Sequence, residues 1–127
     1  MSTRAKTRAI EMASEALLQA IRSHDRQLVF AHDGTEERRY LELRQANANV
    51  GGEAMTHIVL LPDARKIEAI EEFLHGTQFR LGIISDTQVV GPEVHVKRFM
   101  IRHARLLGIS AADVHVLKLM LGDEPDG

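Results

Sequence analysis

The sequence has no cysteine and no tryptophan, and only 4% of its residues are aromatic. Without a thiol the chain has no disulfide frame, no thiolate metal site and no cysteine nucleophile. With so few aromatic rings it also lacks a stacking platform of the kind that binds single-stranded nucleic acid. Its 16 basic and 18 acidic residues give a formal charge of −2, which excludes a globally basic protein of the histone type. These absences favour a binding function over catalysis.

A long apolar run is also missing. No segment approaches the roughly 20 apolar residues that a membrane-spanning helix requires. The basic start of the chain is followed by Glu11 and Glu15 rather than by an uninterrupted apolar stretch of the signal-peptide type. We therefore expect a cytoplasmic protein with no membrane partner. The 127 residues suffice for one domain with its own core, which we expect to fill the chain apart from flexible ends at about residues 1–7 and 123–127.

Hydrophobic periodicity predicts a helix and then a β-hairpin in the first half of the chain. An amphipathic first helix is predicted by apolar residues that recur at helical spacing, namely Ile10, Ala13, Leu17 and Ile21. Asp33-Gly34 supplies the positive φ angles of a tight turn, so residues 28–31 and 40–43 are predicted to pair as a hairpin. The run 45–53 is rich in Asn and Gly and is predicted to be a flexible loop.

The second half predicts a β-α-β unit followed by two helices. The apolar run 57–61 is typical of a strand covered on both faces, and Pro62-Asp63 and His75-Gly76 suit the start and end of a helix. Residues 79–84 are predicted to form the next, parallel strand, with a short further strand at 89–90. From residue 93 to 121 the period is helical, with one interruption at 108–110. The predicted fold class is α+β, with an N-terminal helix, a β-hairpin, a β-α-β unit forming a small mixed sheet, and a C-terminal helical pair.

The most specific motif lies in this helical pair. Ala104 supplies a small residue on the first helix, Gly108 a turn glycine, and Val114 and Leu117 the apolar packing of the second helix. This pattern resembles the helix-turn-helix of DNA-binding regulators, and the resemblance implies a second helix lying in a major groove. The candidate nucleic-acid contacts are Lys97, Arg98, Arg102, Arg105, Ser110 and His115. Among them, only Ser110 and His115 come from the second helix and could bond to a base edge; Arg, Asn and Gln are missing there.

The second helix is also more apolar than one buried face requires. An all-round apolar helix must be covered on more than one side. Val116, Leu119 and Met120 are therefore candidate contacts with a protein partner or with a second copy in a homodimer. Burial of this helix between the sheet and the preceding helix is the alternative.

Motifs for catalysis or metal binding are scarce. The seven histidines include no pair at i, i+4 spacing and no His-Glu-x-x-His pattern, so we expect no metal and no cofactor. One candidate ligand corner is Asp63 with Ser85, Asp86 and Thr87, because open sheets bind ligands beyond the carboxyl ends of parallel strands. Two carboxylates there could share acid and base roles. Alternatively, Asp63 caps a helix and the other residues form a turn.

Three hypotheses follow from the sequence. The preferred one is a small non-enzymatic regulatory or adaptor protein, homodimeric, that acts through protein contacts of its C-terminal helical pair. The second is a helix-turn-helix DNA-binding regulator. The third is a small enzyme that uses the strand-end carboxylate corner.

Overall fold

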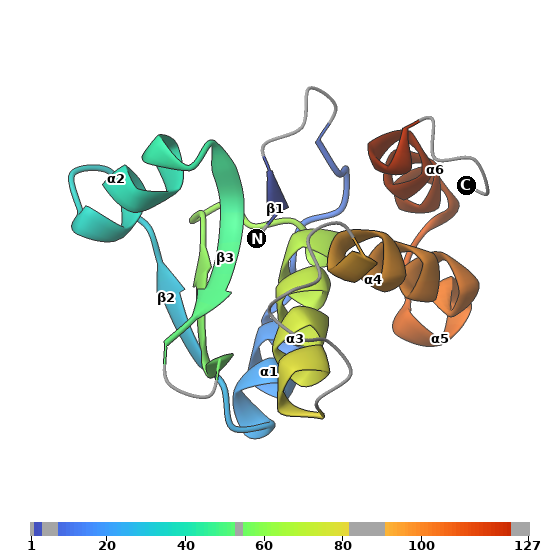
Figure 1. Ribbon diagram of the computed structural model, residues 1–127, viewed down its shortest axis with the longest axis horizontal. Coiled ribbons are helices and arrows are strands. Elements are labelled where there is room, and N and C mark those ends of the chain that lie inside the picture. The colour runs from blue at the N-terminus through green and yellow to red at the C-terminus, as the bar shows by residue number, and fades with distance from the viewer. Residues whose placement is uncertain (1, 4–7, 53–54, 82–90, 123–127) are drawn as a thin grey trace.

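A computed structural model describes residues 2–3, 8–52, 55–81 and 91–122 (Figure 1). It has the predicted α+β class, with a small mixed sheet bracketed by helices. The strands are β1 (Ser2–Thr3), β2 (Gln27–Phe30), β3 (Ala46–Gly51) and β4 (His57–Leu60). The strand order is β1-β3-β4-β2, with β2 parallel to β4 and β3 antiparallel to both of its neighbours. The predicted apolar strand is confirmed as β4, which pairs on both edges.

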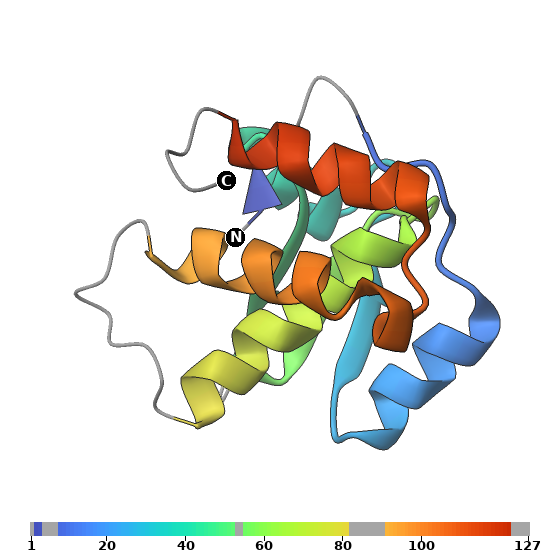
Figure 2. The ribbon, with the colours of Figure 1, turned by 90° about the vertical axis from the view of Figure 1, so that its right-hand side faces the viewer.

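The helices form layers on the sheet. Helices α1 (Glu15–Ser23) and α3 (Lys66–Arg80) cover one face, and their apolar side chains pack with Ile58 and Leu60 of β4 (Figure 1). Helix α2 (Glu36–Leu43) packs at the other face, where Leu41 is buried. Helices α4 (Gly91–Arg102), α5 (Ala104–Leu107) and α6 (Ala111–Leu121) form an outer layer on α3, in which α4 and α6 lie side by side and antiparallel (Figure 2).

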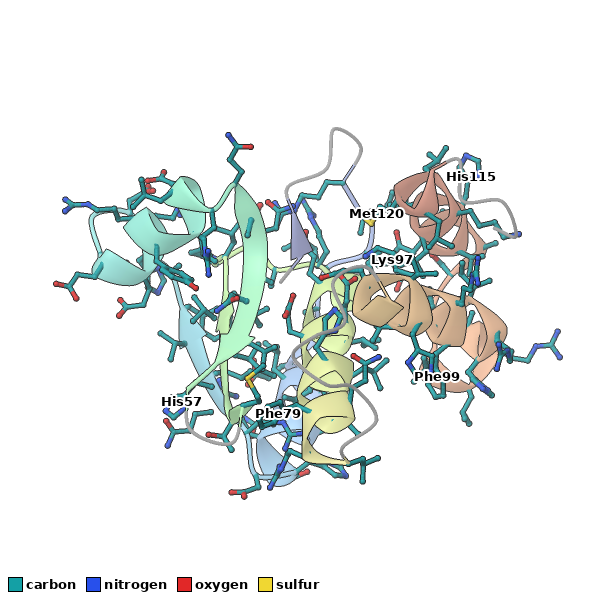
Figure 3. All side chains as sticks on the ribbon, viewed as in Figure 1. His57, Phe79, Lys97, Phe99, His115 and Met120 are labelled. Atoms are coloured by element: carbon teal, nitrogen blue, oxygen red, sulfur yellow. The ribbon has the colours of Figure 1, made fainter. Side chains whose placement is uncertain are left out.

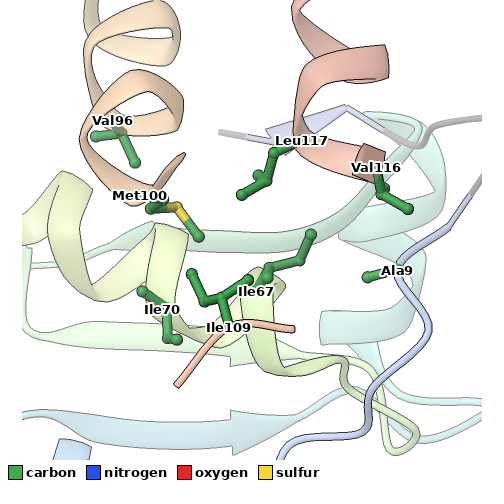
Figure 4. Packing of buried hydrophobic residues seen from close by; sticks show 8 residues of the cluster. All are labelled: Ala9, Ile67, Ile70, Val96, Met100, Ile109, Val116 and Leu117. Atoms are coloured by element: carbon green, nitrogen blue, oxygen red, sulfur yellow. The ribbon is translucent and has the colours of Figure 1, made fainter. Parts of the chain in front are cut away.

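A separate apolar cluster joins α3 to this outer layer (Figure 4). Its buried residues are Ala9, Ile67, Ile70, Val96, Met100, Ile109, Val116 and Leu117. Helix α3 therefore has core on two sides, which explains why polar residues along it are also buried. Among the helices described, none combines the length and apolar character needed to span a membrane.

The predicted hairpin at Asp33-Gly34 is wrong. Residues 36–43 form helix α2, whose N-cap is Thr35, with its side-chain oxygen accepting a hydrogen bond from the Arg38 amide at 3.2 Å. Glu36 and Glu37 occupy the first turn, where the positive end of the helix dipole stabilises carboxylates. The Asp-Gly turn therefore leads into a helix rather than into a second strand.

The predicted loop at 45–53 is also wrong, since residues 46–51 form β3 in the interior of the sheet. Helix α3 continues through His75-Gly76 to Arg80, so the predicted strand 79–84 does not begin at Phe79. A Cβ atom on Gly76 would lie 3.0 Å from the Met55 carbonyl oxygen, which shows that this glycine permits close packing rather than ending the helix. Residues 82–84 and the predicted short strand 89–90 lie outside the described residues.

The parallel pair is consequently not the predicted one. Strands β2 and β4 are parallel, and the chain between them contains α2 and β3. At the N-terminus, the first helix begins at Glu15 after the cap Ser14, so Ile10 and Ala13 precede it in a non-helical segment. Residues 8–13, which we call the N-terminal strap, run beside the starts of α3 and α6. Ser2 and Thr3, predicted to be part of a flexible end, pair with β3.

Candidate functional site

The turn between α5 and α6 has the predicted geometry. Gly108 adopts a left-handed conformation with φ of 71°, which a glycine accepts without a Cβ penalty. Ser110 caps α6 by accepting a hydrogen bond from the Asp113 amide at 3.2 Å. Ile109 between them is buried in the core. Two helical segments joined by a tight capped turn are therefore present, but the single helix expected before the turn is divided at His103 into α4, which ends at Arg102, and the four-residue α5.

Helix α6 exposes one face. Its exposed residues recur at helical spacing and are Ala111, Ala112, His115, Lys118 and Leu119. Leu119 is 52% exposed and Met120 is half-buried, whereas Val116 is buried in the core (Figure 3 labels Met120 and His115). Val116 therefore packs inside the domain, and Leu119 and Met120 are the predicted partner contacts that remain near the surface.

Cations follow the neighbouring helices. Arg102 and Arg105 are exposed and Arg98 is half-buried. Lys97 does not belong to this group, because its ammonium is buried between the carboxylates of Glu71 and Glu93. We therefore correct the predicted phosphate-facing set by removing Lys97 from it.

The predicted ligand corner is described only in part. Asp63 is exposed and forms ion pairs with Arg8 at 3.0 Å and Arg65 at 3.7 Å. Burial acts to raise the pKa of Asp63, but the hydrogen bond and charge of Arg8 outweigh it and lower the pKa. This carboxylate is therefore suited to ion pairing rather than to acid catalysis. Ser85, Asp86 and Thr87 lie outside the described residues, so the corner stays a prediction.

The N-terminal strap fixes the start of α6. The fully buried carboxylate of Asp113 accepts hydrogen bonds from the amides of Ile10 at 2.7 Å and Glu11 at 3.2 Å. The guanidinium of Arg8 donates two hydrogen bonds to the carboxylate of Glu68 on α3, from Nε at 2.7 Å and from Nη2 at 2.8 Å. Charge-assisted bonds of this kind are stronger than neutral ones. The exposed face of α6 is thus held on a rigid support.

A buried polar cluster, which the sequence did not reveal, lies between α3 and α4. We define it as Glu71, His75, Gln78, Glu93 and Lys97. The Lys97 ammonium donates to Glu71 and, at 3.0 Å, to Glu93, while His75 Nε2 lies 3.5 Å from the same Glu93 oxygen. His75 Nδ1 and Gln78 Oε1 are 3.0 Å apart. Buried charges are rare unless they are paired, so this cluster is a candidate site in its own right.

Charges within the cluster stabilise one another. Burial acts to lower the pKa of His75, but contact with Glu93 and the charges of Glu72, Glu93 and Glu71 raise it. Burial acts to raise the pKa of Glu93, but His75 and Lys97 hold it well below its usual range. Burial likewise opposes the charge on Lys97, yet its two carboxylate partners raise its pKa. Lys97 therefore stays an ammonium and is not a nucleophile.

One signal for this cluster was present in the sequence. Glu71 and His75 are four residues apart on α3, a spacing that puts both side chains on one face of a helix. Glu93 comes from a different helix, and no local pattern indicates that α4 packs there. Histidine spacing alone therefore does not indicate the cluster.

An open apolar pocket of about 200 Å³ borders the cluster. Its lining comes from α3, from Leu81 directly after it, and from α4, and consists of Leu74, Thr77, Gln78, Leu81, His95, Val96 and Phe99. Gln78 belongs to both the pocket and the cluster, and its Nε2 lies 2.7 Å from His95 Nδ1. Apart from Gln78 and His95, the lining offers few groups that could orient a polar ligand.

The chain matches no protein-family model, no curated protein and no solved structure. The functional argument therefore depends on the site geometry alone.

Proposed function

We propose that the protein is a small non-enzymatic adaptor or regulator that binds an acidic protein partner through its C-terminal helical surface. We define this surface as Arg102, Arg105, Leu106, His115, Lys118 and Leu119. Between residues 94 and 122 the only carboxylate is Asp113, and it is fully buried. Every exposed charge of this region is therefore positive. This observation carries the proposal.

Apolar side chains accompany these cations. Leu106 is 85% exposed and Leu119 is 52% exposed. Exposed leucines gain free energy when a partner covers them, at roughly 25 cal/mol for each Å² removed from water. Exposed cations on the same helices contribute less to affinity, but they select a partner of opposite charge and speed its association. The combination favours an acidic surface with apolar side chains.

The same charges argue against a symmetric homodimer through this surface. In a two-fold dimer each residue of the surface meets the same patch of the other copy. Arg102, Arg105 and Lys118 would then face a patch that carries the same three cations, and like charges in contact destabilise an interface. We accordingly favour a different protein over a second copy as the partner.

DNA binding is the second candidate, favoured by the left-handed Gly108 and the Ser110 cap. Arg102, Arg105 and Lys118 could contact three phosphates. The slope of log K against log salt is about −0.9 for each neutralised phosphate, so affinity for a duplex would fall about 40-fold between 50 and 200 mM salt. Base readout is limited, because Ser110 is engaged as a cap and, with Lys118 assigned to a phosphate, His115 is the remaining exposed polar side chain of α6.

Affinity capture from a native extract tests the proposal, with nuclease-treated and untreated arms. We expect wild-type protein to retain an acidic partner after nuclease treatment. Leu119→Asp should lower the captured amount by about tenfold, equivalent to about 1.4 kcal/mol. The control is Leu43→Asp, the same change at a leucine that is 78% exposed on α2, far from the C-terminal helices (Figure 1).

Two results would overturn this proposal. Equal capture by the wild type and both variants would show that this surface is not used. Loss of all capture after nuclease treatment, together with steeply salt-dependent binding to a duplex, would favour the DNA-binding alternative.

A further inference from the structure

We propose that Glu71, His75 and Glu93 form a binding site for a divalent transition metal such as Zn²⁺, in competition with the ammonium of Lys97. One potential ligand atom from each residue lies within 4.8 Å of the other two. Tetrahedral ligands at the usual Zn²⁺ distances lie about 3.3 Å apart, so no pair of ligand atoms must close by more than about 1.5 Å. Rotation of two glutamate side chains can supply such a movement. The proposal is independent of the C-terminal helical surface.

The orientation of His75 supports a metal ligand. Its Nδ1 lies 3.0 Å from Gln78 Oε1, and the Gln78 amide nitrogen lies 2.7 Å from His95 Nδ1. An amide oxygen can only accept, so His75 carries a hydrogen on Nδ1 and directs Nε2 toward Glu93. Metal-binding histidines are typically held in this way, with the second ring nitrogen donating to an oxygen.

The Nε2 atom of His75 is a second, independent indication. His75 is 7% exposed, and within the described part of the chain Nε2 has no hydrogen bond of good geometry. Its contact with Glu93 is long, at 3.5 Å. A buried nitrogen that faces carboxylates without a good hydrogen bond is suited to a proton or a metal ion.

Local charge favours the same conclusion. Lys97 brings one positive charge to Glu71 and Glu93. A divalent ion would bring two, and would bind the same oxygens directly. Buried carboxylates require such compensation, because desolvation of an isolated charge is costly.

The ligand types define the class of metal. One imidazole nitrogen with two carboxylate oxygens suits Zn²⁺, Mn²⁺, Fe²⁺ or Co²⁺, whereas an all-oxygen set would suit Mg²⁺ or Ca²⁺. Three protein ligands leave a fourth tetrahedral position for water or a substrate. The side chain of Glu93 is 33% exposed, which gives the ion a route from solvent. The expectation of no metal came from histidine spacing, which does not consider a glutamate contributed by a second helix.

Metal titration of the purified full-length chain tests this proposal. After treatment with a chelator, Co²⁺ is added and its visible absorption is recorded, and Zn²⁺ binding is measured by calorimetry. We expect one equivalent of either metal to bind. His75→Gln should weaken binding at least tenfold, whereas His115→Gln, the same change at an exposed histidine, should leave it unchanged. Lys97→Met removes the competing ammonium and should strengthen binding, with a higher Tm in the presence of Zn²⁺.

A direct readout covers the case in which a variant does not fold. In the wild-type protein, the ring signals of His75 in an NMR spectrum should shift on addition of one equivalent of Zn²⁺ before those of the exposed His115. Equal affinity of the wild type and His75→Gln would overturn the proposal. So would absence of binding to the wild type, even if Lys97→Met binds the metal, because Lys97 would then be the permanent counter-ion of the cluster.

Discussion

Replacement of Asp113 tests how the exposed face of α6 is supported. Its buried carboxylate accepts hydrogen bonds from the amides of Ile10 and Glu11. Because Asp113 lies in the first turn of α6, the positive end of the helix dipole also stabilises the carboxylate. Asp113→Ala leaves two partly buried amide donors without their acceptor. Hydrogen bonds to a charged group contribute roughly 1.5–3 kcal/mol each, and water that reaches the strap recovers part of this loss. We expect a total loss of about 2–4 kcal/mol.

This loss is large enough to measure by urea denaturation and by thermal unfolding. For a chain of this length, 1 kcal/mol corresponds to roughly 4 °C, so Tm should fall by roughly 8–16 °C. Hydrogen exchange at the Ile10 and Glu11 amides should accelerate more than exchange in the sheet. Asp113→Asn keeps one acceptor oxygen and should lose less. The control Asp33→Ala, at a side chain that is 93% exposed, should change stability by less than about 0.5 kcal/mol.

Two results would refute this reasoning. One is a loss below about 1 kcal/mol for Asp113→Ala, which would mean that the strap does not depend on the carboxylate. The other is unchanged exchange at Ile10 and Glu11 in a destabilised variant, which would place the effect elsewhere in α6.

Three further predictions concern other supports of the fold. Gly108→Ala forces a Cβ into the left-handed conformation with φ of 71°, and urea denaturation should show a loss of about 1 kcal/mol. The contact of His75 with Glu93 should stabilise the folded protein most between pH 4.5 and 6.5. At higher pH the contact is lost because His75 deprotonates through its raised pKa. At lower pH it is lost because Glu93 is protonated through its lowered pKa. The stability difference between wild type and His75→Gln should therefore shrink on both sides of this window. Arg8→Lys removes the bidentate pair with Glu68 and should cost about 1 kcal/mol, measured in the same assay, although the charge is kept.

The turn between α5 and α6 could be predicted because its signals are local. Gly108 and Ser110 specify the turn and the cap through their own backbone and side chain. The strand at 57–60 could be predicted for a similar reason, since a continuous apolar run suits a strand that is covered on both faces. Each of these elements needs little information from the rest of the chain.

The region from residue 33 to 51 could not be predicted from the same signals. Asp33-Gly34 suits a hairpin turn, but Thr35 and the two glutamates that follow it are also a helix start, and the Thr35 cap decides the outcome. Strand β3 has low intrinsic β propensity. It forms because Ala46 and Ala48 are small enough to be fully buried in the interior of the sheet, a tertiary effect that local sequence does not contain.

The candidate sites likewise depend on contacts between distant parts of the chain. Exposure of Leu119 and burial of Val116 follow from how α6 sits on α3 and α4, which helical periodicity alone does not fix. Lys97 has the sequence context of a phosphate-binding cation, yet its ammonium is paired with the carboxylate of Glu71, which lies 26 positions away in the sequence. Long-range ion pairs of this kind become visible only once the helices are placed.

Hydrogen–deuterium exchange on the captured complex tests the central claim most directly, because it locates the partner without any substitution. The proposal predicts slower exchange in the amides of α5 and α6, residues 104–107 and 111–121, and unchanged exchange in α2. Protection confined to α2 or to the sheet, with α5 and α6 unchanged, would contradict the assignment of the C-terminal helical surface as the binding surface.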